Sequence, residues 1–273
     1  MNQTEESPKI RLVVFDWAGT TVDFGCFAPV AAFVAAFADK GVEITSAEAR
    51  GPMGLHKRDH IRTLLQDESI ARRWTEATGA DWTEADVEDL YERFTPLQVE
   101  EAARYTELIP GVLEAQQFLR DQGIKIGSTT GYPRSVMQPV LKAAAEQGYQ
   151  PDHVLCADEV PAGRPAPWMI YGNMQALNVF PPAQVLKVGD TVPDIGAGLN
   201  AGVWSVGLTD TGSEVGLTAA EWNAVSAADQ ESKREAVAEK LLQAGAHDVI
   251  HSVRELPMLI ERLNQKLAAR KRP

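Results

Sequence analysis

The 273-residue chain has little cysteine and fewer basic than acidic groups. Its two cysteines, Cys26 and Cys156, are far apart and form no CxxC pair, which excludes a disulfide framework and a structural zinc site and fits a reducing cytoplasm. Lysine and arginine number 26 against 38 aspartate and glutamate residues, which gives a net charge of −12. Because like charges repel, we expect neither a nucleic acid nor a membrane surface as a partner.

The chain also lacks long apolar runs, and we expect no targeting segment. Its longest apolar stretch, residues 27–38, contains Pro29 and is too short to span a bilayer. The N-terminal segment MNQTEESPKI is polar and does not have the basic-then-apolar order of a signal peptide. With 44% hydrophobic and 23% charged residues, the composition is that of a soluble globular protein of one large domain or two. We therefore expect a cytoplasmic protein.

Short apolar runs that read as buried strands alternate with helical periodicity over much of the chain. The runs cover residues 10–15, 124–127, 153–156, 185–188 and 203–206. Between them lie helical stripes, formed by Val112, Ala115, Phe118 and Leu119, by Val136, Met137, Val140 and Leu141, and by Ile170, Met174 and Leu177. Gly123, Gly148 and Gly202 stand where C-terminal cap glycines are expected. The alternation predicts an α/β fold, with a Rossmann-like parallel sheet and helices on both of its faces.

Residues 26–103 break the alternation, because they show helical patterns and no convincing strand. Val30, Phe33, Val34 and Phe37 form one apolar stripe, and Thr45 with Glu48 and Thr83 with Asp86 read as capping boxes that open further helices. We therefore expect an all-helical cap domain over 26–103, inserted into a catalytic core formed by 1–25 plus 104–273. The basic tail, 265–273, is expected to fray.

Chemically useful side chains follow four of the predicted strands. Asp16 follows the first run directly, residues 128–131 (STTG) end the second, Arg164 comes after the third, and Asp190 ends the fourth. An aspartate after a strand is most often a turn or cap residue, but four such features at one sheet edge are hard to explain that way. Asp16 and Asp190 would suit Mg²⁺, while a hydroxyl, backbone donors and a guanidinium could hold a phosphoryl group.

These residues resemble the haloacid dehalogenase superfamily of phosphotransferases, whose nucleophile is the aspartate that closes the first strand. The superfamily pattern is DxD, and its second aspartate protonates the leaving group. Ala18 stands at that position here. The departure argues against ordinary phosphate monoester hydrolysis, because an alkoxide leaving group needs a proton.

Within the superfamily, the chain resembles phosphonoacetaldehyde hydrolases (phosphonatases). The motifs are DWAGTTVDFGCFAP from Asp16, MGLHKRDH at 53–60, GSTTGY at 127–132, VPAGRPAPWM at 160–169 and KVGDTVPD at 187–194. The resemblance implies that Lys57 forms a Schiff base with the aldehyde and that Asp16 takes the phosphoryl group. It implies Mg²⁺ held by Asp16, the backbone carbonyl of Ala18 and Asp190, with Asp194 in support.

The resemblance also assigns a substrate pocket and a partner. The residues that match substrate-binding positions are Met53, Cys26, Thr130, Gly131, Tyr132 and Arg164. It implies a small-molecule phosphonate as substrate, released in the degradation of 2-aminoethylphosphonate, and a homodimer formed through the cap helices. Met53 is also explained as a simple apolar filler, and nothing near Cys26 in the sequence suggests an activated thiol.

The chemistry explains why a lysine replaces the missing acid. Direct cleavage of a P–C bond would expel a carbanion, whereas an iminium ion on the neighbouring carbon lets that carbon leave as a neutral enamine. Lys57 must be neutral to form the imine, and we expect burial and the adjacent Arg58 to lower its pKa. His60, three residues on, is either a proton shuttle or a packing residue.

Two other functions remain open from the sequence. One is a superfamily phosphatase or mutase that acts on a small phosphate ester, which Ala18 disfavours. The other is a non-catalytic binding homologue. It is disfavoured by the presence of Asp16, Lys57, Arg164, Asp190 and Asp194.

Overall fold

The computed structural model describes residues 8–53 and 55–273. Most of the polar N-terminal segment and Gly54, part of the 53–60 motif, lie outside the described residues. The described part contains a six-stranded sheet with the order β3-β2-β1-β4-β5-β6, and every neighbouring pair is parallel. Its strands are β1 Leu12–Phe15, β2 Lys125–Thr129, β3 His153–Leu155, β4 Val185–Gly189, β5 Trp204–Leu208 and β6 Asp248–Ile250.

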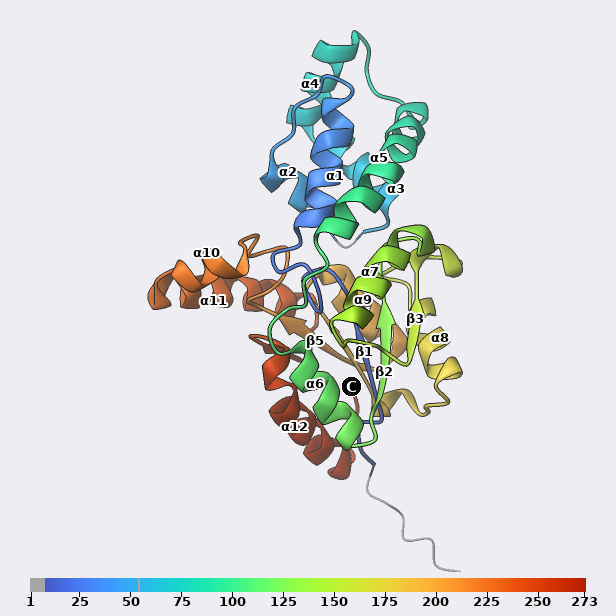
Figure 1. Ribbon diagram of the computed structural model, residues 1–273, viewed down its shortest axis with the longest axis vertical. Helices are drawn as coiled ribbons and strands as arrows, with labels where there is room; N and C mark the ends of the chain where they lie inside the picture. Colours follow the sequence, from blue (N-terminus) through green and yellow to red (C-terminus); the bar gives the residue numbers. More distant parts are fainter. Residues whose placement is uncertain (1–7, 54) are drawn as a thin grey trace, which may run out of the picture.

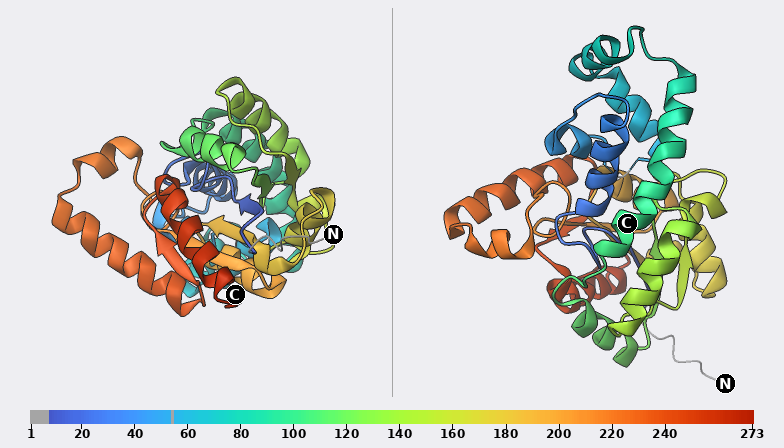
Figure 2. Two further views of the ribbon diagram at one scale, coloured as in Figure 1. Left: turned by 90° about the horizontal axis from the view of Figure 1, so that it is seen from below. Right: turned by 45° about the horizontal axis from the view of Figure 1, so that its top comes forward.

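Helices cover both faces of this sheet, as predicted (Figure 2). β1 shows why, because Val13 and Phe15 pack into one apolar cluster with α6, α7 and α12, whereas Leu12 and Val14 pack into another with α8 and α9. Strand side chains alternate between faces, so a strand that is apolar throughout must be covered on both. These helices are α6 Val112–Asp121, α7 Arg134–Glu146, α8 Trp168–Ala176, α9 Val192–Ala201 and α12 Leu256–Ala268.

A helical bundle stands at one end of the sheet (Figure 1). It consists of α1 Phe27–Ala38, α2 Ser46–Arg50, α3 Lys57–Gln66, α4 Glu68–Thr78 and α5 Glu84–Arg104. The bundle has an apolar core of its own, in which Phe33, Phe37 and Phe94 are fully buried. The two predicted capping boxes are confirmed at the starts of α2 and α5. The predicted stripe on α1 packs into this core, where Val30, Phe33 and Phe37 are buried and Val34 is partly buried.

The last third of the chain differs from the prediction. β6, α10 Ala219–Ala224 and α11 Ala227–Gln243 were not predicted, and α10 with α11 project from the side of the sheet (Figure 1). The expected fraying from residue 265 is wrong in part, because α12 continues to Ala268 and buries Leu267. Short 3₁₀ turns complete the fold at η1 Ala157–Glu159, η2 Pro182–Gln184 and η3 Val253–Glu255.

None of the helices in the described ranges is both long and apolar enough to cross a membrane.

Candidate active site

The sheet register brings the four strand-end features together. Phe15, the last residue of β1, pairs with Ser128 of β2 on one side and with Val188 of β4 on the other. Asp16 therefore leaves the sheet between the STTG segment and Asp190, and its backbone N–H donates to the carbonyl of Val188 at 2.9 Å. The carboxyl ends of neighbouring parallel strands form the floor of the site, as the sequence predicted.

Three buried carboxylates meet on this floor. Asp16, Asp190 and Asp194 each offer an oxygen, and these oxygens lie within 4.8 Å of one another, so the triad can hold a metal ion. Burial, together with the charges of Asp16 and Asp194, raises the pKa of Asp190 to about 7. Unbalanced negative charge of this kind is what a divalent cation compensates. A Cβ at Gly19 would lie 2.8 Å from the Asp190 carboxylate, so the loop leaves space there only for backbone.

Two buried cations balance part of that charge. Arg164 lies 2.9 Å from Asp16 through its Nη1 and also pairs with Asp194. Lys187 on β4 is fully buried, and its Nζ is 2.7 Å from Asp194 Oδ1. Burial opposes ionisation of Asp194, but Arg164 and Lys187 hold its pKa well below the usual value. Asp194 thus fixes the guanidinium beside Asp16, a role consistent with the supporting one expected.

Lys187 was missed by sequence reasoning. It lies in the middle of the apolar run VLKVG, where a charged residue can be stable only with a buried counter-ion. The apolar residues of this run predict an ordinary strand, whereas the lysine within it indicates a buried carboxylate partner.

Lys57 enters the site from the helical bundle, as the first residue of α3. It is 5% exposed, and its Nζ lies 5.3 Å from the ring centre of Phe33 and 5.6 Å from that of Tyr132. Burial lowers the pKa of Lys57 to about 8, and the charge of Arg164 acts in the same direction. An amine of this kind is available in its neutral, nucleophilic form near physiological pH.

The expected role of Arg58 in this shift is wrong. Arg58 points away, pairs with Glu88 at 3.0 Å with both side chains largely exposed, and stacks over Tyr91. Water screens an exposed charge, so the cation that acts on Lys57 is Arg164, which comes from the core and is distant in sequence.

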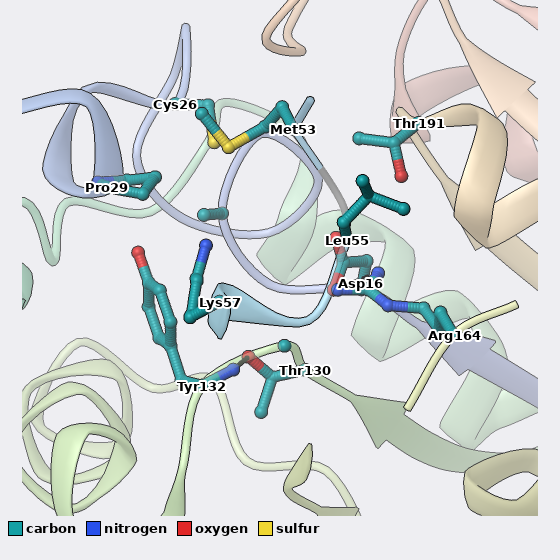
Figure 3. A pocket seen from close by; sticks show the side chains of 12 residues that line it. Asp16, Cys26, Pro29, Met53, Leu55, Lys57, Thr130, Tyr132, Arg164 and Thr191 are labelled. Atoms are coloured by element: carbon teal, nitrogen blue, oxygen red, sulfur yellow. Dashed lines mark hydrogen bonds and ion pairs between the residues drawn. The ribbon is translucent and has the colours of Figure 1, made fainter. Parts of the chain in front are cut away.

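A cavity of about 30 Å³ lies between the helical bundle and the sheet (Figure 3). It is lined by Asp16, Ala18, Cys26, Pro29, Met53, Leu55, Lys57, Thr130, Gly131, Tyr132, Arg164 and Thr191. All the predicted site residues therefore line it except His60, Asp190 and Asp194. Pro29, Leu55 and Thr191 were not predicted, and their apolar or capping character gives no sequence signal of a site.

His60 lies behind the cavity and not in it. The ring is fully buried and stacks on Phe33 with ring centres 3.8 Å apart. Its Nε2 is 2.9 Å from the carbonyl of Ala49, which accepts only, so we assign the ring hydrogen to Nε2. Nδ1 has no hydrogen-bond partner among the described residues. Burial and the charge of Lys57 hold the pKa of His60 well below its usual value, so the ring is a neutral base.

Two other predicted pocket residues are uncharged. Burial raises the pKa of the Cys26 thiol and of the Tyr132 hydroxyl well above their usual values. The Tyr132 hydroxyl has no hydrogen-bond partner in the part of the chain that the structure describes. Tyr132 lies beside Lys57 (Figure 3). Cys26 and Tyr132 therefore both shape the pocket as neutral groups.

This fold and site are matched by a family model and by named relatives. Residues 10–202 match the model of the haloacid dehalogenase-like hydrolases. A phosphonoacetaldehyde hydrolase of Syntrophobacter fumaroxidans is 48% identical over 95% of this chain and 94% of its own, and one of Bacillus cytotoxicus is 47% identical over 94% and 98%. The crystal structure of a phosphonoacetaldehyde hydrolase-like protein from Oleispira antarctica superposes with a TM-score of 0.96 at 42% identity, over 100% of both chains. The chain is a hydrolase that belongs to the phosphonoacetaldehyde hydrolase family of haloacid dehalogenase-like hydrolases.

Proposed function

We propose that the protein hydrolyses the C–P bond of phosphonoacetaldehyde to acetaldehyde and phosphate, in the degradation of 2-aminoethylphosphonate. One observation carries the proposal: a buried lysine with a lowered pKa and a strand-end aspartate line the same cavity. The names of the relatives agree with this substrate.

In the first step Lys57 attacks the aldehyde carbon, and loss of water gives an iminium ion. His60 is our candidate for the proton shuttle of this step, since its Nδ1 is unpaired among the described residues and its ring stacks on Phe33, the ring that Lys57 Nζ also approaches. An oxygen of the Asp16 carboxylate then attacks phosphorus. The P–C bond breaks, and its electron pair moves into the iminium group to form a neutral enamine on Lys57.

In the second half, water hydrolyses the aspartyl phosphate on Asp16 and releases phosphate. The enamine takes a proton at carbon and becomes an iminium ion again, and water then releases acetaldehyde and free Lys57. We propose that Arg164 and the Thr130–Gly131 segment hold the phosphonate oxygens, because they line the cavity next to Asp16. Met53, Cys26 and Tyr132 would surround the carbon end.

The carboxylate triad suits Mg²⁺, which prefers oxygen ligands. Asp16, Asp190 and the carbonyl of Ala18 would hold it, and it would supply charge that offsets repulsion between the Asp16 carboxylate and an anionic phosphonate. Asp194 supports the site through its ion pairs with Arg164 and Lys187.

We propose that residues 26–103 move as a cap over the core formed by 1–25 and 104–273. Two connections join them and run side by side, since the carbonyl of Glu107 accepts from Asp23 N–H at 3.2 Å and that of Thr21 accepts from Ile109 N–H at 2.9 Å. The small cavity supports this proposal, because a site of about 30 Å³ must open before a substrate enters.

We also propose that the protein forms a homodimer through the cap helices and that it is cytoplasmic. The dimer rests on the family resemblance, because Phe33 and Phe37 of α1 are buried within the bundle and contribute nothing to an outer surface. The location rests on the cysteines, which are both buried and unpaired.

Phosphate release tests the function directly. We expect release from phosphonoacetaldehyde and little or none from a panel of sugar and glycolate phosphates, because Ala18 provides no acid for an oxygen leaving group. A preference for an ester would favour a phosphatase or mutase, and no turnover of either class would favour a binding protein.

A further inference from the structure

Arg50 ends α2 and gathers three backbone carbonyls from outside its own helix. Its Nη1 donates to Gly25, and more weakly to Cys26 at 3.3 Å and Ser213 at 3.4 Å. Gly25 and Cys26 belong to the connection that leads into the cap, whereas Ser213 belongs to the loop after β5 in the core. One guanidinium in the cap therefore contacts both the connection and the core.

The same loop, which follows β5, also contacts the side chain of Asp190. The N–H of Ser213 donates to Asp190 Oδ2 at 2.9 Å, and a Cβ at Gly212 would lie 2.4 Å from the Asp190 Cβ. Thr211 donates its hydroxyl to the carbonyl of Gly19 at 2.6 Å, next to the Asp16 loop. Residues 211–213 are thus packed against the candidate metal site on one side and contact Arg50 on the other.

On the cap side, Arg50 begins the segment that carries Lys57. The N–H of Met53 donates to the Arg50 carbonyl at 3.0 Å, and Lys57 follows seven residues after Arg50. The contact is also tight from the core side, since a Cβ on Gly216 would lie 2.9 Å from Arg50 Nε. Arg50 is therefore linked along the chain to Lys57 and through Ser213 to the loop 211–213.

Arg50 is poorly explained as a residue that only stabilises the fold. Its three acceptors are neutral carbonyls, and its Nη2 is buried without a hydrogen-bond partner among the described residues. A buried unmade hydrogen bond costs free energy, on the order of 1–3 kcal/mol. Arg50 makes no ion pair among the described residues, but its guanidinium lies 4.8 Å from the ring centre of Phe27 and is attracted by the charges of Asp23 and Asp190, so it is linked electrostatically to both the connection and the metal site.

We propose that Arg50 is a positioning residue. It couples closure of the cap to the position of residues 211–213, the loop whose Ser213 N–H holds Asp190. When the cap closes, its guanidinium docks on Ser213, so Lys57 reaches the cavity at the same time as Asp190 is fixed by the Ser213 N–H. The proposal rests on the proposed function for the roles of Lys57 and Asp190. Arginine suits the task because its rigid fork of donors can serve several acceptors at once.

The test compares Arg50→Gln with the parent by two readouts that need no substrate. Backbone hydrogen exchange should become faster in residues 23–27 and 209–217, and the Mg²⁺ concentration that gives half of the thermal stabilisation should rise by about 2- to 30-fold. Arg50→Lys keeps the charge with one donor group and should lie between Arg50→Gln and the parent. Arg62→Gln is the matched control, because Arg62 is a partly buried α3 arginine that pairs with Glu84, and it should change neither readout.

A second pair of variants guards against misfolding of Arg50→Gln. Gly216→Ala would place a methyl 2.9 Å from Arg50 Nε and displace the guanidinium without removing it. Its control is Gly79→Ala, which adds a methyl at a similar positive φ where nothing lies within 4 Å. Only Gly216→Ala should raise the Mg²⁺ requirement. Unchanged exchange and Mg²⁺ titration in both Arg50→Gln and Gly216→Ala, or equal changes in the two controls, would overturn the proposal.

Activity then separates this proposal from the proposed function. In Arg50→Gln we expect a higher KM for phosphonoacetaldehyde together with the higher Mg²⁺ requirement. If the parent itself releases no phosphate from phosphonoacetaldehyde, the proposed function fails, while the exchange and Mg²⁺ readouts still decide the role of Arg50.

Discussion

Lys57 is a buried amine whose protonated form cannot attack a carbonyl. Burial and Arg164 lower its pKa to about 8 from an ordinary value of 10.5, so the neutral fraction grows as pH rises toward 8. We predict that imine formation with acetaldehyde, trapped by cyanoborohydride and followed by protein mass, becomes faster by about tenfold per pH unit below 8 and levels off above it. A trapping rate that keeps rising up to the ordinary value would contradict the lowered pKa.

Asp190 should act on the metal requirement. Its carboxylate accepts from Ser213 N–H at 2.9 Å and from the Thr20 hydroxyl at 3.3 Å, which orients it toward Asp16. We predict that Asp190→Ala raises the half-saturating Mg²⁺ concentration for phosphate release by at least about tenfold, by analogy with losses at metal sites. Asp248→Ala, which removes the half-buried partner of the exposed Arg262, is the control. An Mg²⁺ titration that Asp190→Ala leaves unchanged would remove this residue from the metal site.

At this scale the sequence could predict the residues but not all of their partners. Asp16 and Asp190 follow apolar strands directly, so the parallel sheet alone brings them together. The charge that acts on Lys57 could not be predicted, because Arg164 reaches it only after the cap folds over the core. The depth of His60 was undetermined for the same reason, since a helix face shows which residues lie together but not how deeply they are buried.

At the scale of elements, we expect the stability of the bundle α1–α5 to depend on its own apolar core. Phe37 is fully buried within the bundle, so Phe37→Ala should cost about 3–5 kcal/mol of stability there. We predict that hydrogen exchange accelerates in α1, α3 and α5 while amides of β1 and β4 remain protected. Leu259→Ala, which empties the cluster between α12 and the sheet, should show the opposite distribution. Equal acceleration throughout the molecule in both variants would mean that the cap does not fold as a separate unit.

The predictable elements are those with a strong apolar period. Each of the five predicted strands is an apolar run in the sequence, and all five are confirmed. β6 is only three residues long and partly exposed, so it has no such run. α11 buries only Val237 and Leu241 out of its 17 residues, so its sequence shows almost no apolar stripe, although it forms a regular helix.

For the molecule as a whole, the small cavity bears on the proposed motion of the cap. The space between the helical bundle and the sheet is about 30 Å³, close to what a water molecule or two requires, and the proposed cap motion would make this the closed state. We predict that crystal structures with and without a phosphonate analogue differ in the separation of Lys57 Nζ from the Asp16 carboxylate, with the larger separation in the free protein. One fixed separation, too long for both groups to contact the analogue, would contradict the cap model.

The central claim is that C–P cleavage runs through an imine on Lys57. The most direct measurement is to add borohydride together with phosphonoacetaldehyde or acetaldehyde and to map the modified peptide. We predict loss of activity and a stable added mass at Lys57, no trapping in Lys57→Arg, and retained trapping in Asp16→Asn, which lacks the nucleophile but keeps the amine. Trapping at a different lysine, or C–P cleavage by Lys57→Arg, would contradict the account.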